Sequence, residues 1–359
     1  MTTMAIDNKD KKVLNVPHLR FPEFSGEWEN TELQYIAPNI CSGKDKPTSN
    51  GTVALYGSTG IIGMTRLASY NEEIVLVARV GANAGQLQIT TIPCGVTDNT
   101  LIINAKEWNR YIYYYLQHYN LNRLVFGSGQ PLITGSMLKK LKIIYGEESE
   151  RNKIVNLLCL LDERIATQNK IIEKLQSLIK GLRVCCMQRV YGNNVYLSEI
   201  AQIYQPQTIS STELTEDGFL VYGANGIIGK YKDYNHETEQ ICITCRGNTC
   251  GMVNYTKPMS WITGNAMVIN TDKYQDKVCK RYLYHYLSAY NFNSIISGSG
   301  QPQIVRTPLE KLKITLPTIS EQKQKAIIFD KIQDKIDINH KVLNLYIGQK
   351  QYLLRQMFI

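Results

Sequence analysis

The sequence lacks long apolar runs and a secretion signal. None of its 359 residues lies in a run near the ~20 consecutive apolar residues that a membrane-spanning helix needs. The first ten residues, MTTMAIDNKD, are polar, unlike a signal peptide. Nine cysteines, an odd number scattered without a framework, suit a reducing compartment better than disulfides do. We therefore expect a cytoplasmic protein with no membrane partner.

The common signatures of catalytic and metal centres are also missing. The five histidines form no HExxH pair, and no Gly-Lys-Ser/Thr string is present for ATP. No Asn/Asp-Pro-Pro-Tyr/Phe string serves amino-methyl transfer to a base. Cys242, Cys245 and Cys250 could form a metal set, but residues three apart on a strand point to opposite faces. The sequence predicts buried thiols there, no catalytic residue, and no cofactor or metal bound by this chain.

What the chain does contain is a half-length repeat. Residues 57–63 (GSTGIIG) return at 223–229 as GANGIIG, and the string GSGQP at 127–131 returns unchanged at 298–302. The two copies of the first string are 166 residues apart and those of the second string 171. The second copy of the repeat therefore contains a short insertion relative to the first, near residues 273–281. Solenoid repeats recur every 20 to 50 residues or so, whereas this period indicates two whole domains of one kind.

The charge lies mainly outside these repeats. The net charge is +9, and most of the excess falls in residues 149–190 and 319–359. The repeats themselves are nearly neutral on average. If they bind DNA, their basic groups must be gathered on one face.

The two basic stretches each run without proline and predict helices roughly 60 Å long at 1.5 Å per residue. Apolar residues recur in steps of three and four, which is the heptad seam of a coiled coil. The first seam is Ile154, Leu158, Leu161, Ile165, Gln168, Ile172, Leu175 and Ile179, and the weaker second seam is Phe329, Ile332, Ile336, Asn339, Leu343 and Tyr346.

Each seam has one polar member at the same place, Gln168 and Asn339. If the helices pair antiparallel, these amides meet and fix the register. A parallel pair would align them too, and two surface helices packed separately on their own domains are the plainer alternative. We prefer the antiparallel pair because the second domain provides the chain that returns.

Within each repeat the pattern mixes strands and helices. Residues 73–78 and 240–244 read as strands that lead into glycine-rich turns at 81–85 and 247–251. Tyrosine-rich runs follow, and their spacing of three or four favours helices with core rings over base-stacking platforms. The predicted fold class is α+β, with domains at 1–148 and 191–318 and long helices at 149–190 and 319–359.

The order of domain, helix, domain, helix, with RFPEFSGEW at 20–28 and the doubled GSGQP, resembles the specificity subunit of type I restriction-modification enzymes. The resemblance covers nearly the whole chain. It implies two target recognition domains that each read half of a bipartite site in double-stranded DNA. It also implies an antiparallel helix pair that sets the spacing and docks two methyltransferase subunits. Those partners would carry S-adenosylmethionine, and motor-nuclease subunits would use ATP and magnesium.

Candidate DNA-contacting residues lie beside the repeated glycines, where the backbone can approach phosphate and side chains can reach base edges. They differ between the copies, as two different half-sites require, and arginine to guanine or asparagine to adenine are the expected pairings. The alternative is that these loops only turn the chain and that the repeated glutamines share a structural hydrogen bond. The candidates are Ser58, Thr59, Arg79, Asn83 and Gln130 in the first copy, and Asn225, Lys230, Arg246, Asn248 and Gln301 in the second.

Two other classes of function stay open on the sequence alone. A free-standing DNA-modifying enzyme would be active when purified alone and would bind its own cofactor. A coiled-coil-linked module for another polymer would purify without a methyltransferase. If the helix pair sets the distance between the two half-sites (a ruler), the number of unread base pairs between them should change with helix length.

Overall fold

The computed structural model describes residues 15–127, 129–188, 190–224, 226–298 and 300–359. The chain divides into two compact units, and each is described by itself. One unit combines the chain up to Gln168 with Val342–Ile359, and the other is Asn169–Lys341. Each unit therefore holds one mixed α/β domain and one half of each of two long helices.

In the described part of domain 1, which lies in the first unit, short strands form three sheets. A four-stranded sheet has the order β2 (Cys41–Ser42), β8 (Thr100–Ile103), β5 (Val75–Ala78), β6 (Leu87–Ile89). A three-stranded sheet has the order β4 (Gly60–Thr65), β3 (Val53–Gly57), β7 (Cys94–Val96), and β1 (Glu29–Glu32) pairs with β9 (Lys142–Tyr145). The helices are α1 (Leu33–Ile36), α2 (Asn109–Tyr119) and α3 (Gly135–Lys139), with 3-10 turns η1 (Lys106–Trp108) and η2 (Leu121–Leu124).

Domain 2, in the second unit, repeats this plan. Its four-stranded sheet has the order β11 (Gln202–Tyr204), β17 (Ala266–Asn270), β14 (Ile241–Thr244), β15 (Val253–Tyr255). Its three-stranded sheet has the order β13 (Gly226–Tyr231), β12 (Phe219–Gly223), β16 (Trp261–Ile262), and β10 (Asn193–Tyr196) pairs with β18 (Lys313–Leu316). The helices are α5 (Lys280–Ala289) and α6 (Arg306–Glu310), with 3-10 turns η3 (Leu197–Glu199), η4 (Ser211–Glu213), η5 (Asp272–Tyr274) and η6 (Phe292–Ser294).

The likeness of the domains extends to register. The β3–β4 hairpin has a bulge between Leu55 and Tyr56, and the β12–β13 hairpin has one between Val221 and Tyr222. In both domains the central strand of the three-stranded sheet also pairs in parallel with a third strand. The predicted duplication and the predicted α+β fold class are therefore confirmed.

The tyrosine-rich runs form helices whose rings belong to the domain cores. Tyr111 of α2 and Tyr282 of α5 are at most 2% exposed. The Tyr111 hydroxyl donates to the carbonyl oxygen of Ile144 at 2.8 Å. Burial raises the pKa of Tyr111 well above its usual value. These tyrosines hold the domains together, as their spacing predicts, and are not free to stack on bases.

The long helices are α4 (Glu148–Gln188) and α7 (Ile319–Gln356). A side-chain cap precedes α7, because the Glu321 amide donates to the Thr318 hydroxyl at 3.3 Å while the Thr318 amide donates to the Glu321 carboxylate at 3.1 Å. No helix in the part of the chain that the structure describes is long and apolar enough to cross a bilayer.

Within the first unit the helix halves run antiparallel. Lys350 Nζ of α7 lies 2.6 Å from Asp162 Oδ1 of α4, and the Arg164 guanidinium lies over the Tyr346 ring. Residue numbers therefore rise along α4 as they fall along α7. The Tyr114 hydroxyl of α2 also donates to Asp162, at 2.8 Å, so one carboxylate joins the domain to both helices.

The second unit shows the same direction. Lys325 Nζ of α7 donates to the Cys186 carbonyl oxygen of α4 at 3.3 Å. Further along, His285 of α5 accepts from Arg183 of α4 at 3.1 Å and bonds Asp330 of α7 at 2.8 Å. Within each unit, the parts of α4 and α7 pack on the domain and on each other. Antiparallel pairing and packing on the domain, which the sequence left as alternatives, therefore occur together.

The predicted seam residues are all buried or half-buried. Ile154, Leu158 and Leu161 join the core of the first unit, and Phe329 and Ile336 join that of the second. Gln168 and Asn339 are each 8% exposed but belong to different units, so their predicted pairing stays a prediction.

The RFPEFSGEW segment holds the start of α4. Arg20 makes two bonds to the Glu150 carboxylate, at 2.7 and 2.8 Å, and the Trp28 indole N–H donates to it at 3.0 Å. Glu150 is completely buried. A buried carboxylate needs such charged and polar partners, so this segment anchors domain 1 to its helix.

Candidate nucleic-acid interface

In domain 1 the two repeated glycine-rich turns, far apart in sequence, are hydrogen-bonded to each other. The amide of Gly81, in the glycine turn (81–85), donates to the carbonyl oxygen of Pro131, in the GSGQP turn (127–131), at 2.9 Å. The Ile133 amide donates to the Arg79 carbonyl oxygen, also at 2.9 Å. The two turns therefore form one surface.

The third repeated element, the tip of the β3–β4 hairpin (57–60), is tied to the same strands. Gln88 Nε2 on β6 donates to the carbonyl oxygens of Gly57 and Ser58, both at 3.0 Å. Because β6 directly follows the glycine turn, the tip and that turn belong to one end of the domain.

Domain 2 repeats the arrangement. The Gly247 amide donates to the Pro302 carbonyl oxygen at 2.9 Å, and the Ile304 amide donates to the Cys245 carbonyl oxygen at 3.0 Å. The hairpin tip is tied differently, because the Thr244 hydroxyl of β14 donates to the Ala224 carbonyl oxygen. The backbone junction of the turns is thus common to both domains, whereas the side chain that holds the tip is not.

Glycine is required where the GSGQP turn opens. Gly127 has φ +102° and Gly298 has φ +94°, a region that residues with a Cβ rarely adopt. A Cβ at Gly127 would lie 2.6 Å from the Gln130 carbonyl oxygen, and one at Gly298 would lie 2.4 Å from that of Gln301. The duplicated string is therefore needed for the turn itself.

In domain 1 the structure leaves most candidate contact residues accessible. Thr59, Asn83 and Gln130 are exposed, and Ser58 is half-buried. Arg79 is half-buried and donates to the Ser42 hydroxyl at 3.3 Å, which orients its guanidinium.

In domain 2 Arg246, Asn248 and Gln301 are exposed on the corresponding turns. Asn225 lies outside the described residues. Lys230 lies on β13, where its ammonium is 3.3 Å from the carboxylate of Asp217. Asp217 is fully exposed, and an ion pair at the surface is weak, so Lys230 stays a candidate.

The cysteines near this interface behave as buried thiols. Burial raises the pKa of Cys242 far above its ordinary value and also raises that of Cys245. Thiolate is the form that binds metal, so these shifts oppose ligation. Among the described residues no group of His, Cys, Asp and Glu is arranged to hold a metal ion.

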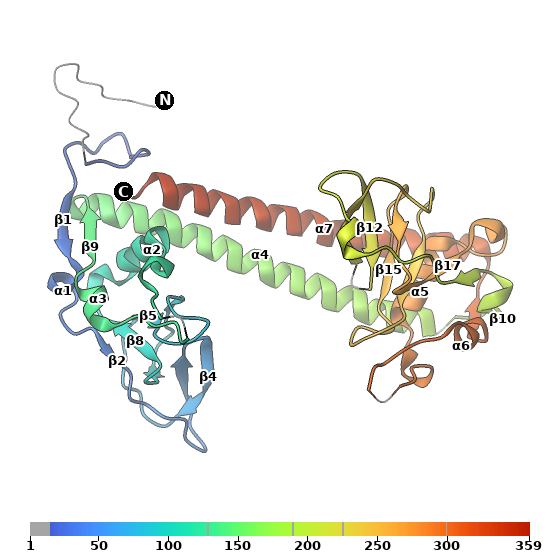
Figure 1. The fold of residues 1–359 in the computed structure, drawn as a ribbon, viewed down its shortest axis with the longest axis horizontal. Coiled ribbons are helices and arrows are strands. Elements are labelled where there is room, and N and C mark those ends of the chain that lie inside the picture. The colour runs from blue at the N-terminus through green and yellow to red at the C-terminus, as the bar shows by residue number, and fades with distance from the viewer. Residues whose placement is uncertain (1–14, 128, 189, 225, 299) are drawn as a thin grey trace. The chain divides into compact units, whose positions relative to one another are not determined.

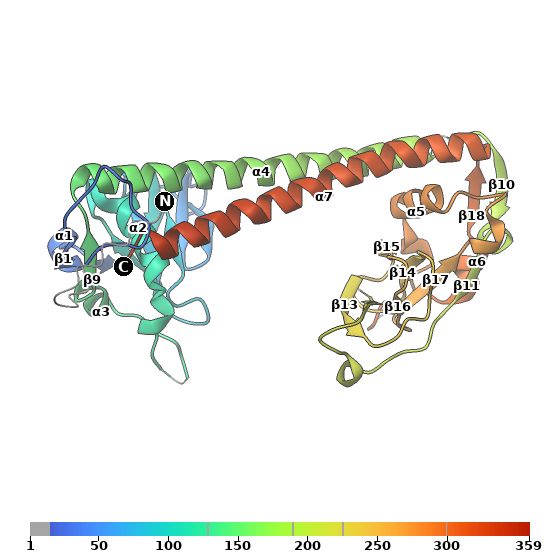
Figure 2. The same ribbon diagram turned by 90° about the horizontal axis from the view of Figure 1, so that it is seen from above.

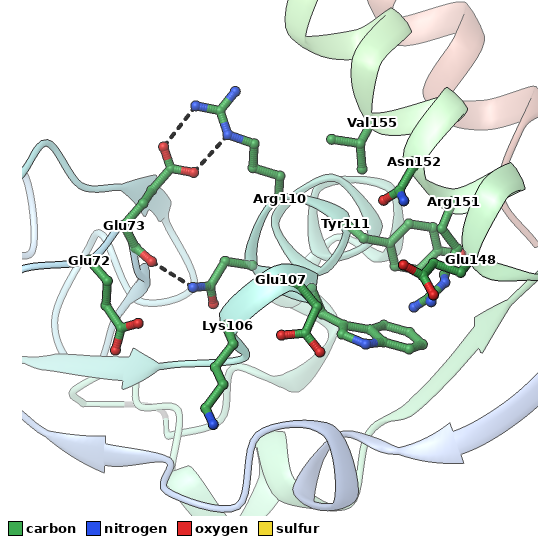
Figure 3. Close-up of a pocket in the computed structure, with 12 residues that line it drawn as sticks. Glu72, Glu73, Lys106, Glu107, Arg110, Tyr111, Glu148, Arg151, Asn152 and Val155 are labelled. Atoms are coloured by element: carbon green, nitrogen blue, oxygen red, sulfur yellow. Dashed lines mark hydrogen bonds and ion pairs between the residues drawn. The ribbon is translucent and has the colours of Figure 1, made fainter.

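Domain 1 also has a cavity of 500 Å³ where α2 meets the start of α4 (Figure 3). Both charge signs line it. Arg110 makes two 2.8 Å bonds to Glu73, and the Arg151 guanidinium lies 3.4 Å from the centre of the Trp108 ring. The cavity has neither the basic bias that phosphate requires nor a metal cluster. It is best explained as the joint between domain and helix.

Sequence reasoning missed the residues that tie the hairpin tips, Gln88 and Thr244. They do not correspond in the repeat, since Asn254 stands at the place of Gln88 and Ala78 at that of Thr244. A repeat comparison finds what two copies share, so it has no signal for such contacts.

The architecture defines a duplicated protein in which two copies of one mixed α/β domain alternate along the chain with two long helices (Figure 1). Each copy presents a surface framed by glycines, with different exposed side chains beside them. The model of the type I restriction modification DNA specificity domain matches residues 12–177 and 193–345. The chain belongs to this family, and the resemblance seen in the sequence is confirmed.

Among known proteins, the type I restriction enzyme EcoprrI specificity subunit of Escherichia coli is 31% identical over 147 residues, which cover 40% of this chain and 36% of that one. A putative specificity subunit of Haemophilus influenzae is 27% identical over 140 residues, 37% of this chain and 35% of that one. The MjaVIII specificity subunit of Methanocaldococcus jannaschii is 24% identical over 331 residues, 76% of this chain and 75% of that one. The first two matches thus span little more than a third of those relatives.

Solved structures share the fold. The S subunit of a type I restriction-modification system from M. genitalium gives a TM-score of 0.70 at 18% identity, covering 96% of this chain and 99% of that one. A second solved structure, which concerns the complex assembly and conformational transition of the type I R-M system, gives a TM-score of 0.54 at 15% identity. The match covers 95% of this chain and 99% of that one. At these identities the likeness concerns the fold alone.

Proposed function

We propose that this chain is the DNA sequence-specificity subunit of a type I restriction-modification complex. Each domain reads one half of a bipartite site in double-stranded DNA. The observation that carries the proposal is the shared turn junction, Gly81 to Pro131 and Gly247 to Pro302, which presents different exposed side chains in the two copies. One scaffold with two sets of polar groups is what reading two different half-sites requires.

The long helices set the spacing between half-sites and dock two methyltransferase subunits. Exposed apolar side chains on the helices support this role, since exposed apolar surface marks protein interaction sites. In the first unit Leu345 and Tyr352 are exposed, and in the second unit Leu178, Ile327 and Ile328 are exposed. Each unit would dock one methyltransferase.

In this proposal the chain is not catalytic. S-adenosylmethionine would bind to the methyltransferase subunits, and ATP and magnesium to motor-nuclease restriction subunits. The sequence supports this division, because it has neither a Gly-Lys-Ser/Thr string nor the Asn/Asp-Pro-Pro-Tyr/Phe string of amino-methyl transfer.

Base-resolved methylation mapping tests the proposal. The chain and its cognate methyltransferase are expressed together in a host without type I systems, and each is expressed alone as a control. We expect one bipartite N6-methyladenine motif only when both are present. Methylation by the chain alone would show a free-standing enzyme. No new motif with an active methyltransferase would contradict a role in specificity.

A further inference from the structure

Each hairpin tip is followed by two adjacent isoleucines that remain accessible. Ile61 and Ile62 of β4 are 55% and 54% exposed, and Ile227 and Ile228 of β13 are 54% and 47% exposed. Adjacent residues on a strand normally face opposite sides, so one of each pair would be buried if the strand were covered. Here β4 and β13 are edge strands of three-stranded sheets.

One isoleucine of each pair packs closely against a repeated glycine. A Cβ at Gly57 would lie 2.9 Å from Ile62 Cγ2, and one at Gly223 would lie 2.9 Å from Ile228 Cγ2. The glycine that opens each tip thus leaves room for an isoleucine to lie over the turn. Both domains therefore expose an isoleucine pair at the same place. Ser58 and Thr59, which lie between Gly57 and the pair, are replaced in the second copy.

Exposed isoleucines that recur in both copies, while the residues before them change, are suited to contact something that both half-sites share. Sequence-reading groups differ between half-sites, whereas deoxyribose rings and the faces of stacked bases are common to all DNA. Isoleucine is among the apolar side chains that pack into grooves and against base steps.

We propose that the isoleucine pairs Ile61–Ile62 and Ile227–Ile228 form apolar DNA contacts that supply affinity independently of sequence. The inference rests on the proposed function, and it adds a role that base reading does not require. The contacts lie on the same hairpins as the tips, so DNA that reaches the tip also reaches the pair.

The position of the hairpins favours DNA over a methyltransferase as the occupant. Within its own domain, β4 lies on the side away from α4 in Figure 1, and β13 lies on the side away from α7 in Figure 2. A methyltransferase docked on the helix faces would therefore meet a different surface.

The test measures DNA binding by the complex of the full chain with its methyltransferase subunits. Two duplexes serve as probes: one that carries the motif found by methylation mapping, and one of arbitrary sequence and equal length. The variant Ile61→Thr with Ile227→Thr keeps the β-branched shape and removes apolar surface. We expect about tenfold weaker binding to both duplexes.

Two controls accompany this variant. Leu67→Ser changes an apolar residue that is 71% exposed outside the hairpin, and its complex should bind both duplexes as the wild type does. The second control is the melting temperature of the Ile61→Thr, Ile227→Thr chain itself, which should equal that of the wild type because both residues are exposed on edge strands.

Unchanged DNA affinity in the Thr variant would overturn the inference. So would loss of complex assembly in the absence of DNA, because it would place a methyltransferase on the isoleucines. If the effect were confined to the cognate duplex, the residues would read sequence and the inference would again be wrong. A wild-type complex that binds neither duplex would instead refute the proposed function.

Discussion

The backbone amide of Gly81 donates a 2.9 Å hydrogen bond to the carbonyl oxygen of Pro131, and this bond joins the glycine turn to the GSGQP turn. The second domain makes the same bond between Gly247 and Pro302. A contact between backbone atoms is indifferent to neighbouring side chains. The frame can therefore be kept while the exposed residues beside it change.

The first prediction concerns the glycine that opens the GSGQP turn. Gly127→Ala forces a Cβ to within 2.6 Å of the Gln130 carbonyl oxygen at positive φ. We expect it to lower the free energy of unfolding by roughly 1–2 kcal/mol, measured by urea denaturation. Gly129→Ala is the control, since nothing lies within 4 Å of its added Cβ. Equal stability of the two variants would contradict the account of the turn.

The second prediction concerns Arg246 on the glycine turn of domain 2. Its exposed guanidinium is suited to pair with a guanine edge. Arg246→Ala should cost about 1–3 kcal/mol of binding to the cognate duplex and relax the mapped motif at one position of one half-site. The control Lys273→Ala removes an exposed cation away from the turn. A motif that becomes degenerate in both halves would argue against one domain for each half-site.

The third prediction concerns His285, which is completely buried. Its Nδ1 accepts from Arg183 and its Nε2 donates to Asp330, so the ring is neutral. Burial lowers its pKa below the ordinary 6.5, although Asp330 opposes the shift and Arg183 and Arg281 add to it. The unfolded chain therefore binds this proton more readily than the folded chain does. Stability is fully present above pH 6.5 and falls as the pH drops toward the folded pKa, by at most about 1.4 kcal/mol per pH unit.

Urea denaturation between about pH 5 and 7 checks this, because Asp330 and Asp272, whose pKa values are lowered from 3.8, contribute at lower pH. His285→Gln should flatten the dependence in this window. His340→Gln, at an exposed position of α7, should leave it unchanged. Burial also lowers the pKa of His236. His236 therefore still contributes to the pH dependence of stability in both variants.

The fourth prediction concerns the helices as a ruler. Deleting residues 170–176 and 331–337 removes one heptad from each helix and keeps the seam spacing, Gln168 and Asn339. Seven residues correspond to about 10 Å of helix, or about three base pairs. Methylation mapping should show a shorter spacer or no methylation. A spacer of unchanged length would refute the ruler.

Much of the fold could be predicted because it depends on local pattern. The strand predicted at 73–78 is β5 at Val75–Ala78, and the first tyrosine-rich run, predicted to be helical, forms α2 at Asn109–Tyr119. The heptad seam predicts which helix residues are buried, since period and burial are linked. The site was less predictable, because the string GSTGIIG does not reveal that both of its isoleucines stay exposed on the folded domain.

By itself, then, the sequence determined that one domain is used twice, that two long helices accompany it, and that glycines mark the shared turns. These follow from periodicity and from the backbone freedom that only glycine has. Tertiary structure alone decided which distant turns meet, which side chains hold the hairpin tips, and which apolar residues stay exposed. Those outcomes depend on contacts between segments far apart in the chain, and no local pattern encodes them.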